Sequence, residues 1–152
     1  MRAKEYVQTL SRFFVDNPAG KAYYEWVLSK GEEFEQDPCS PKCRDIMHEV
    51  CSGERFKVKE CYYNAWRLAA AGKRNGVRYY EGWGSGIIPT EHAWAVADGT
   101  VLDPTWKKIM GRETISYFGI ELPIQWVTKM TVKKKMVEPM LFLYWKEKVG
   151  KL

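Results

Sequence analysis

The sequence predicts an α+β fold in which a small antiparallel sheet lies between N-terminal and C-terminal helices. Apolar residues recur at helical spacing up to residue 51 and again after residue 123, whereas strand patterns gather between 77 and 122. Asp98-Gly99, between two strand patterns, is a hairpin signal, and hairpins join antiparallel strands. Helices, then strands, then helices are typical of α+β proteins rather than of alternating βαβ units.

The chain has 152 residues, of which 45% are hydrophobic and 14% aromatic. This length suffices for one packed core, so we expect a single domain over 1–152. We expect it to comprise a helical N-terminal part (1–58), a core that carries the chemistry (59–122) and basic C-terminal helices (123–152). The sequence has no internal repeat, low-complexity tract or linker.

Three helices are indicated in the N-terminal part by apolar spacing and by residues that favour helix ends. They are predicted over residues 2–15, 19–30 and 41–51. Asn17-Pro18 stops the first helix, Gly31 suits the end of the second, and Ser40 can cap the third. The acidic stretch GEEFEQDP, residues 31–38, is predicted to be a loop.

The middle of the chain begins with its strongest helix pattern. Residues 61–71, CYYNAWRLAAA, are rich in alanine and end before Gly72. Strands are then expected at VRYYEGW (77–83), HAWAVAD (92–98), TVLDPTW (100–106) and 115–122. Two C-terminal helices are predicted over 124–135 and 138–147.

Cys61 is the first residue of the predicted helix 61–71. Helix N-termini carry a partial positive charge, which favours the thiolate form of a cysteine. Lys57 and Lys59 lie just upstream and add positive charge. Because the thiolate is the nucleophilic form, the helix start is a suitable position for a reactive cysteine.

His92 and Asp103 are placed relative to each other by the register of the predicted hairpin. With Asp98-Gly99 as a two-residue loop, Asp103 lies opposite Trp94. His92 shares a face with Trp94 because strand side chains alternate, so Asp103 lies diagonally across from His92, about 7–8 Å away at the backbone. An aspartate there can fix the imidazole tautomer and leave the other nitrogen to activate a thiol. The helix that carries Cys61 would have to pack on this face.

The segment HAWAVADGTVLDPTW, residues 92–106, resembles the His and Asp segment of the transglutaminase-like superfamily, which has a papain-like core. In that family a strand His followed by Ala-Trp precedes an Asp-Pro-Thr, and a cysteine opens a helix upstream, as Cys61 opens CYYNAWRLAAAG. The resemblance covers 59–106 and has the order and spacing of a compact member. It implies a papain-like fold with Cys61 as nucleophile, His92 as base and Asp103 as the residue that orients the histidine.

The resemblance implies a cysteine enzyme that transfers an acyl group from an amide: a peptidase, amidase, deamidase or transglutaminase. Water would resolve the thioester in a hydrolase and an amine would do so in a transferase, and the sequence does not choose between them. RFKVKE, just upstream of Cys61, offers no clear oxyanion side chain, so the donor we can name is the Cys61 backbone N–H. This gap favours the alternative, a non-catalytic binding protein that uses the same fold to engage a macromolecular partner.

Side chains on the first predicted strand are candidates for contact with a substrate. Tyr80 and Trp83 lie beside a Gly-Ser-Gly loop and are candidates for the wall of a groove. Glu81 alternates with Tyr80 along the strand and is a candidate for meeting a cationic substrate. The plainer interpretation is that most of the aromatic rings belong to the core and that Glu81 is a solvated carboxylate.

Four soft side chains within thirteen residues raise the question of a zinc site. They are Cys39, Cys43, His48 and Cys51. Cys43 shares the apolar face of the predicted helix with Met47, whereas His48 and Cys51 lie on another face. Joint ligation from a rigid helix is awkward, so we interpret the cysteines as buried or idle thiols and expect neither a metal nor another cofactor.

The net charge of +5 belongs entirely to the C-terminal segment. Residues 129–152 hold seven lysines against Glu138 and Glu147. No recognised nucleic-acid-binding motif accompanies the lysine run at 133–135, so we expect a protein or peptide substrate rather than nucleic acid. No apolar run approaches the roughly 20 residues that span a bilayer, and the N-terminal residues lack a secretory signal. We therefore expect a cytoplasmic protein that does not associate with membranes.

Overall fold

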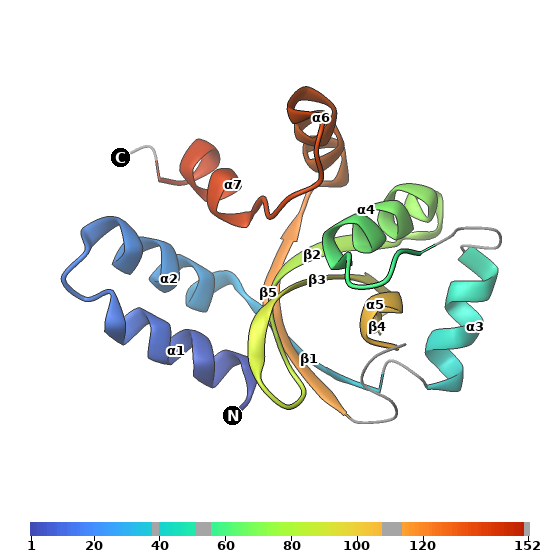
Figure 1. Ribbon diagram of the computed structural model, residues 1–152, viewed down its shortest axis with the longest axis horizontal. Coiled ribbons are helices and arrows are strands. Elements are labelled where there is room, and N and C mark those ends of the chain that lie inside the picture. Colours follow the sequence, from blue (N-terminus) through green and yellow to red (C-terminus); the bar gives the residue numbers. More distant parts are fainter. Residues whose placement is uncertain (38–39, 51–55, 108–113, 151–152) are drawn as a thin grey trace.

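The computed structural model describes residues 1–37, 40–50, 56–107 and 114–150, and its centre is a twisted antiparallel sheet (Figure 1). The strands are β1 (Glu32–Gln36), β2 (Arg78–Ser85), β3 (Pro89–Ala97), β4 (Thr100–Leu102) and β5 (Ile115–Leu122). Their order across the sheet is β1-β5-β2-β3-β4, and each neighbouring pair is antiparallel. The mixed class with an antiparallel sheet is thus confirmed, and the papain-like core stays a prediction.

The helices of the described residues are α1 (Ala3–Phe13), α2 (Pro18–Lys30), α3 (Pro41–Val50), α4 (Cys61–Ala71), the short α5 (Pro104–Lys107), α6 (Ile124–Lys134) and α7 (Leu141–Lys148), with a 3₁₀ turn at Lys73–Asn75. The predicted cap at Ser40 is present, and Asn17, which was predicted to end the first helix, caps the second. The Asn17 side chain accepts the Gly20 N–H, and the Ser40 hydroxyl accepts the Cys43 N–H. Within the described ranges, no helix has the length and apolar character that a bilayer span requires.

The stretch 31–38, predicted to be a loop, contains a strand instead. β1 pairs with β5, with Phe34 opposite Tyr117. Phe34 is the sole large apolar residue in EEFEQ, and its ring packs edge-on against Tyr80 at a centroid distance of 5.3 Å. The neighbouring glutamates are exposed, which suits a strand at the edge of a sheet. A strand is predicted from apolar and polar residues that alternate, and a stretch with one apolar residue is too short to show this alternation.

The segment TVLDPTW, predicted as one strand, divides into a strand and a helix. β4 ends at Leu102, and Pro104 is the first residue of the one-turn helix α5. Proline suits this position because its missing N–H would have no partner in the first turn of a helix. The change of structure falls at Asp103, whose side chain caps the new turn by accepting the Trp106 N–H at 3.1 Å.

The hairpin register predicted from Asp98-Gly99 is confirmed. Both residues have left-handed backbone, with φ of 52° and 71°, as a type I′ turn requires. Ala97 pairs with Thr100, which brings Asp103 alongside His92 at the far end of the short strand β4. The local turn therefore determines the relative position of two chemically important side chains.

The two faces of the sheet carry different side chains. One face, which we call the aromatic face, carries the buried rings of Tyr80, Trp94, Trp106 and Tyr117. The opposite face carries the alanines of β3, aliphatic and aromatic residues of β5, and Tyr79 and Trp83 of β2. They pack in one apolar cluster with buried residues of the long helices. We call this the helix-covered face, and Figure 1 shows α4, α6 and α7 on one side of the sheet.

Candidate active site

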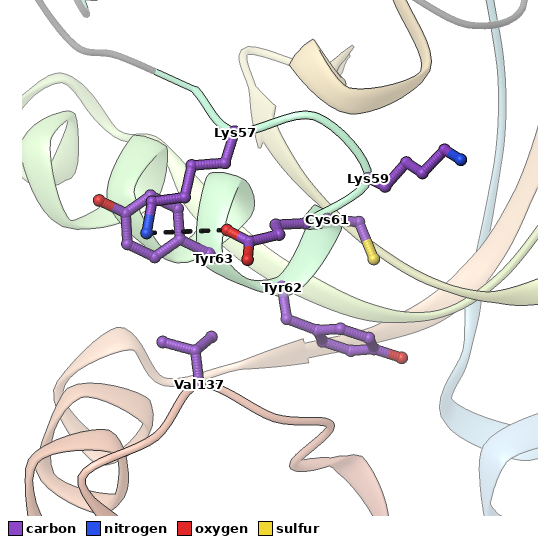
Figure 2. Close-up of a pocket in the computed structure, with 7 residues that line it drawn as sticks. Lys57, Lys59, Cys61, Tyr62, Tyr63 and Val137 are labelled. Carbon is purple, nitrogen blue, oxygen red and sulfur yellow. Dashed lines mark ion pairs between the residues drawn. The ribbon is translucent and has the colours of Figure 1, made fainter.

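Cys61 is the first residue of α4, as predicted. The helix begins there because Glu60 has non-helical backbone, with φ −108° and ψ 67°. The Cys61 side chain is half-buried and lines a cavity of about 450 Å³ (Figure 2). The other lining residues are Lys57, Lys59, Glu60, Tyr62, Tyr63 and Val137. The thiol therefore faces a space that can hold a ligand rather than the packed core.

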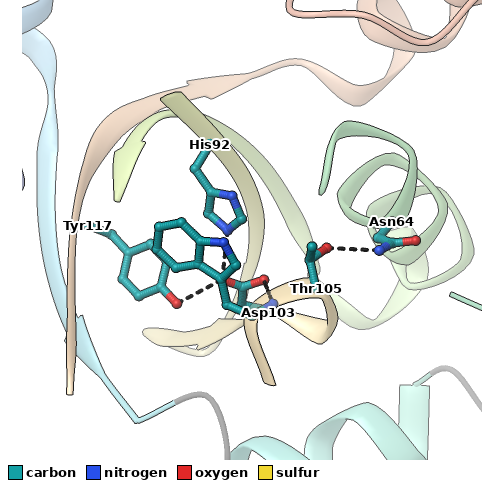
Figure 3. Close-up of polar contacts among 6 residues, drawn as sticks. Asn64, His92, Asp103, Thr105 and Tyr117 are labelled. Carbon is teal, nitrogen blue, oxygen red and sulfur yellow. Dashed lines mark hydrogen bonds and ion pairs between the residues drawn. The ribbon is translucent and has the colours of Figure 1, made fainter. Parts of the chain in front are cut away.

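His92 belongs to β3 and is 1% exposed, and its side chain lies on the aromatic face of the sheet. Its Nε2 lies 2.7 Å from Asp103 Oδ2, so the predicted proximity of the two side chains is confirmed (Figure 3). The imidazole stacks on the Trp106 ring with centroids 3.8 Å apart and planes 11° apart. Stacking and hydrogen bonding together fix the plane and the direction of the imidazole.

Asp103 is 1% exposed and accepts hydrogen bonds on both oxygens. Oδ2 also accepts the Tyr117 hydroxyl at 2.8 Å, and Oδ1 accepts the Trp106 N–H at 3.1 Å. These donors compensate for burying the carboxylate and hold its orientation. Burial and the nearby Asp103 charge raise the pKa of Tyr117, so its hydroxyl keeps the proton that it donates. Our sequence reasoning missed Tyr117 because its position depends on the pairing of β5 with β2.

Cys61 lies close enough to His92 to act on the pKa of the imidazole. Since Asp103 engages Nε2, Nδ1 is the ring nitrogen left for the thiol. Burial by itself lowers the pKa of His92, but Asp103 and Cys61 outweigh burial and raise the pKa of His92 to about 9. The raised pKa favours the cationic form of His92, which is the form that pairs with a thiolate.

The helix that carries Cys61 packs on the face of the sheet opposite to His92, which corrects our expectation. Ala65 and Leu68 of α4 belong to the same apolar cluster as Ala93, whose side chain alternates with that of His92 along β3. Alanines on this side of β3 give the helix a flat surface, whereas bulky rings occupy the other side. Cys61, the first residue of α4, lies near enough to His92 to act on its pKa.

Two glycines make room for the rings beside His92. A Cβ added at Gly84 would lie 2.5 Å from the Trp106 ring, and one at Gly119 would lie 2.7 Å from the Trp94 ring. Real Cβ atoms do not approach so closely, so each ring occupies its place because the strand has no side chain there. Gly84 therefore helps to set the Trp106 position and, through the stacked ring, that of His92. A glycine within a strand pattern predicts that another group lies close to the backbone, but the sequence does not indicate which group.

Asn64, one turn after Cys61, fixes the loop that leads into α4. It is 1% exposed. Its Oδ1 accepts the Lys57 N–H at 2.8 Å, and its Nδ2 donates to the Lys57 carbonyl at 2.7 Å and to Thr105 Oγ1 at 2.8 Å (Figure 3). One buried amide thus joins the loop, α4 and α5. The sequence reasoning missed Asn64 because a single asparagine in a helix pattern carries no signal of its partners.

The first turn of α4 presents backbone N–H groups beside the cavity. The Glu60 side chain does not cap the helix, and the first intrahelical bond is the one from the Asn64 N–H to the Glu60 carbonyl, at 2.9 Å. Within the described ranges, the N–H groups of Cys61, Tyr62 and Tyr63 therefore have no partner, and these residues line the cavity. Such groups are suitable donors to an oxyanion, a role for which the sequence offers no clear side chain.

The candidate groove residues of β2 lie inside the protein. Tyr80 is fully buried and donates its hydroxyl to Glu32 Oε1 at 3.0 Å, so it is a core residue rather than a groove wall. Trp83 is 2% exposed and packs in the core of the helix-covered face. It also lines a small cavity of about 70 Å³ together with Glu81 and Tyr62. The main space beside Cys61 is bounded by other residues.

Glu81 is 2% exposed, which corrects the interpretation of a solvated carboxylate. Its Oε1 accepts the N–H groups of Met140 and Leu141 at 2.8 and 2.9 Å, and its Oε2 accepts the Tyr79 hydroxyl at 2.7 Å. Burial raises the pKa of Glu81 to about 7, although these donors act in the opposite direction. The carboxylate thus anchors the start of α7 to β2, and contact with a cationic substrate stays a prediction.

Two of the four candidate zinc ligands, Cys39 and Cys51, lie outside the described residues. Cys43 is buried in α3 with its Sγ 3.9 Å from Met47 Sδ, whereas His48 of the same helix is exposed. Among the described residues, no three His, Cys, Asp or Glu side chains are grouped so that they could hold a metal. The expectation of a metal-free protein stays a prediction.

Known proteins offer no match against which this site can be compared. No family model, no curated protein and no solved structure matches the chain. We therefore assign the function from the site itself. The site brings together a half-buried thiol at a helix start, a buried imidazole and a buried carboxylate. We call Cys61, His92 and Asp103 the Cys–His–Asp cluster.

Proposed function

We propose that this protein is a cysteine-dependent enzyme that transfers the acyl group of an amide. The observation that carries the proposal is the arrangement of the Cys–His–Asp cluster: His92 Nε2 lies 2.7 Å from Asp103 Oδ2, and Cys61 lies close enough to act on the pKa of His92. A nucleophile, a base and a group that orients the base are the parts this chemistry needs. The resemblance of residues 92–106 to the transglutaminase-like superfamily supports the same roles.

The proposed reaction proceeds through a thioester. The Cys61 thiolate attacks the amide carbonyl carbon, a C–S bond forms, and the carbonyl electron pair moves to the oxygen. When the oxyanion collapses, the C–N bond breaks and His92 gives its proton to the leaving amine. Water or a second amine then attacks the thioester, transfers a proton to His92 and releases the thiolate. Water as acceptor makes the enzyme a hydrolase, and an amine makes it a transferase.

The surroundings of the cluster support this chemistry because they hold it ready before a substrate binds. Asp103 is held by Tyr117 and by the Trp106 N–H, and His92 is held by Asp103 and the Trp106 ring. Groups fixed in this way need no reorganisation during the reaction. The N–H of Cys61 lies at the cavity, where it can donate to the oxyanion.

The test is the rate at which Cys61 is alkylated by iodoacetamide at pH 6, with each cysteine followed by peptide mass spectrometry. An ordinary thiol, with a pKa of about 8.5, is almost entirely protonated at this pH, so a thiolate paired with His92 should react much faster. His92→Ala should slow Cys61 to the rate of an ordinary thiol. Cys43→Ala is the matched control and should leave the Cys61 rate unchanged. A slow Cys61 in the unaltered protein would contradict the proposal.

A non-catalytic binding protein predicts a different outcome in a functional assay. If the fold serves only as a scaffold, Cys61→Ala and His92→Ala should both keep the full biological effect, because neither substitution alters the surface extensively. The enzyme proposal requires that both substitutions abolish it while binding of the substrate persists. Measuring the effect and the binding for the same two variants therefore distinguishes the alternatives.

A further inference from the structure

The cavity at Cys61 is lined by two lysines that are held differently. Lys57 Nζ lies 3.8 Å from Glu60 Oε2 and 4.3 Å from the centre of the Tyr63 ring, so its charge is already paired within the protein. Lys59 is exposed, and no described residue forms an ion pair or a ring contact with it. In Figure 2, Lys59 lies on the same side of Cys61 as the sulfur, with its nitrogen end directed away from the sulfur, whereas Lys57 turns towards Tyr63.

The backbone of Lys59 is unusual for a lysine. Its φ of 61° lies in the left-handed region, which glycine adopts without steric cost and other residues adopt rarely. The conformation is imposed by the turn, because Asn64 holds the Lys57 backbone and the Glu60 N–H donates to the Lys57 carbonyl at 3.4 Å. The fold alone would favour glycine here. A strained residue beside a reactive group motivates a functional hypothesis.

We propose that Lys59 binds the substrate, and that the site accepts amides with a carboxylate close to the scissile carbonyl, as in an acidic peptide. The inference rests on the proposed function, because it places the carboxylate beside the carbon that Cys61 attacks. Charge complementarity supports it. Among the described residues that line the cavity, Glu60 is the one acidic side chain, and Lys57 already pairs with it, which leaves the Lys59 charge in excess.

Iodoacetate and iodoacetamide are matched probes for this preference. With either reagent the thiolate uses its electron pair to form an S–C bond, and iodide leaves with the electron pair of the C–I bond. The two differ in one group, a carboxylate against a neutral amide, attached to the reacting carbon. The measured quantity is the iodoacetate-to-iodoacetamide rate ratio at Cys61, divided by the same ratio for N-acetylcysteine amide. We call this quotient the anion preference.

Lys59→Gly is the informative variant because it removes the charge and also relieves the left-handed backbone, so the fold should persist. Loss of one cation a few ångströms from the bound carboxylate should lower the anion preference about fivefold at low salt. The difference should shrink at high salt. Lys135→Gly is the control: Lys135 also has left-handed backbone, with φ 56°, but it ends α6 and does not line the cavity. It should leave the anion preference unchanged.

Three outcomes would overturn the inference, and they are distinguishable. If Cys61 reacts rapidly with iodoacetamide but Lys59→Gly leaves the anion preference unchanged, the role of Lys59 is wrong and the proposed function stands. If both lysine variants lower it equally, the cause is the net charge of the protein. If Cys61 reacts with neither reagent faster than N-acetylcysteine amide, the proposed function fails and this inference fails with it.

Discussion

At Asp103 a single buried carboxylate is contacted by donors from three elements. They are His92 of β3, Tyr117 of β5 and the Trp106 N–H of α5. The donors both offset the cost of burial and fix which oxygen faces the imidazole. In the proposed function, Asp103 acts on Cys61 through His92, which makes Asp103 a positioning residue.

Asp103→Asn tests that dependence. The amide fills nearly the same space, so the far-UV circular dichroism should be unchanged. An N–H directed at Nε2 favours the wrong His92 tautomer, so the rate of Cys61 alkylation at pH 6 should fall by at least about tenfold; in a serine-protease triad the equivalent change costs about 10⁴-fold. A smaller loss is expected here because a preformed thiolate–imidazolium pair depends less on the carboxylate. Asp98→Asn, in the exposed turn, is the control, and equal rates in both variants would contradict the assigned role.

At the scale of elements, α4 and α7 are held in place by buried polar side chains as well as by apolar packing. Asn64 joins the start of α4 to α5, and Glu81 of β2 joins the sheet to the start of α7. Both side chains are almost fully buried. Glu81 accepts N–H groups at the start of α7, where the helix itself offers them no partner, whereas Asn64 holds the loop that leads into α4.

Glu81 makes the stability of the fold depend on pH. Its pKa of about 7 in the folded state exceeds the ordinary value of 4.5, so the folded state binds more protons between these two pH values. The free energy of unfolding should therefore fall as pH rises from about 4.5 to 7, by about 3 kcal/mol in total from this group, and then level off. Below about 4.5 the carboxyl is protonated in both states and contributes no difference.

Glu81→Gln isolates this contribution. The amide oxygen can still accept the Met140 and Leu141 N–H groups, so the variant should fold, and its unfolding free energy should lack the decrease between pH 4.5 and 7. The contribution of Glu81 is measured by urea unfolding at a series of pH values, as the difference in unfolding free energy between the unaltered protein and Glu81→Gln. Glu121→Gln, at an exposed carboxylate, should follow the unaltered protein. Parallel curves for Glu81→Gln and the unaltered protein would show that Glu81 titrates normally.

At the scale of the whole molecule, the two faces of the sheet pack against different parts of the protein. The helix-covered face supplies most of the apolar core, whereas the aromatic face encloses the His–Asp pair with rings. The basic C-terminal segment, residues 129–152, carries its lysine run outside both faces. Lys133, Lys134 and Lys135 at the end of α6 are exposed, and Lys134 pairs with Glu138 at 2.7 Å. The excess charge is thus available to an acidic surface without affecting the core.

Replacing the lysines at 133–135 by Gln should change the surface and leave the fold intact. An exposed i,i+4 pair contributes only about 0.5 kcal/mol, so the unfolding midpoint should hardly move. The salt needed to elute the protein from a cation exchanger should fall markedly, because three charges of the single basic segment are lost. The control replaces Lys21, Lys42 and Lys73, which are scattered and exposed, and it should lower the elution salt less. Equal shifts would mean that the segment does not act as a unit.

The sequence by itself determined the features that depend on neighbours along the chain. Helix starts and ends follow from caps such as Asn17 and Ser40, and the register of the β3–β4 hairpin follows from Asp98-Gly99. That register places Asp103 beside His92, because strand alternation and turn geometry are local properties. The order of the Cys–His–Asp cluster was therefore predictable, including the position of the thiol at a helix start.

Only the tertiary structure decided which distant elements meet. Residues 32–36 form a strand because they pair with the edge of β5. Tyr117 lies beside Asp103 because β5 pairs with β2. The helix α4 packs on the face on which β3 carries alanines. Each of these outcomes depends on the total apolar area and the hydrogen bonds gained by a particular long-range pairing. Those gains involve residues far apart in the chain, and so no local pattern at Phe34, Tyr117 or Asn64 encodes them.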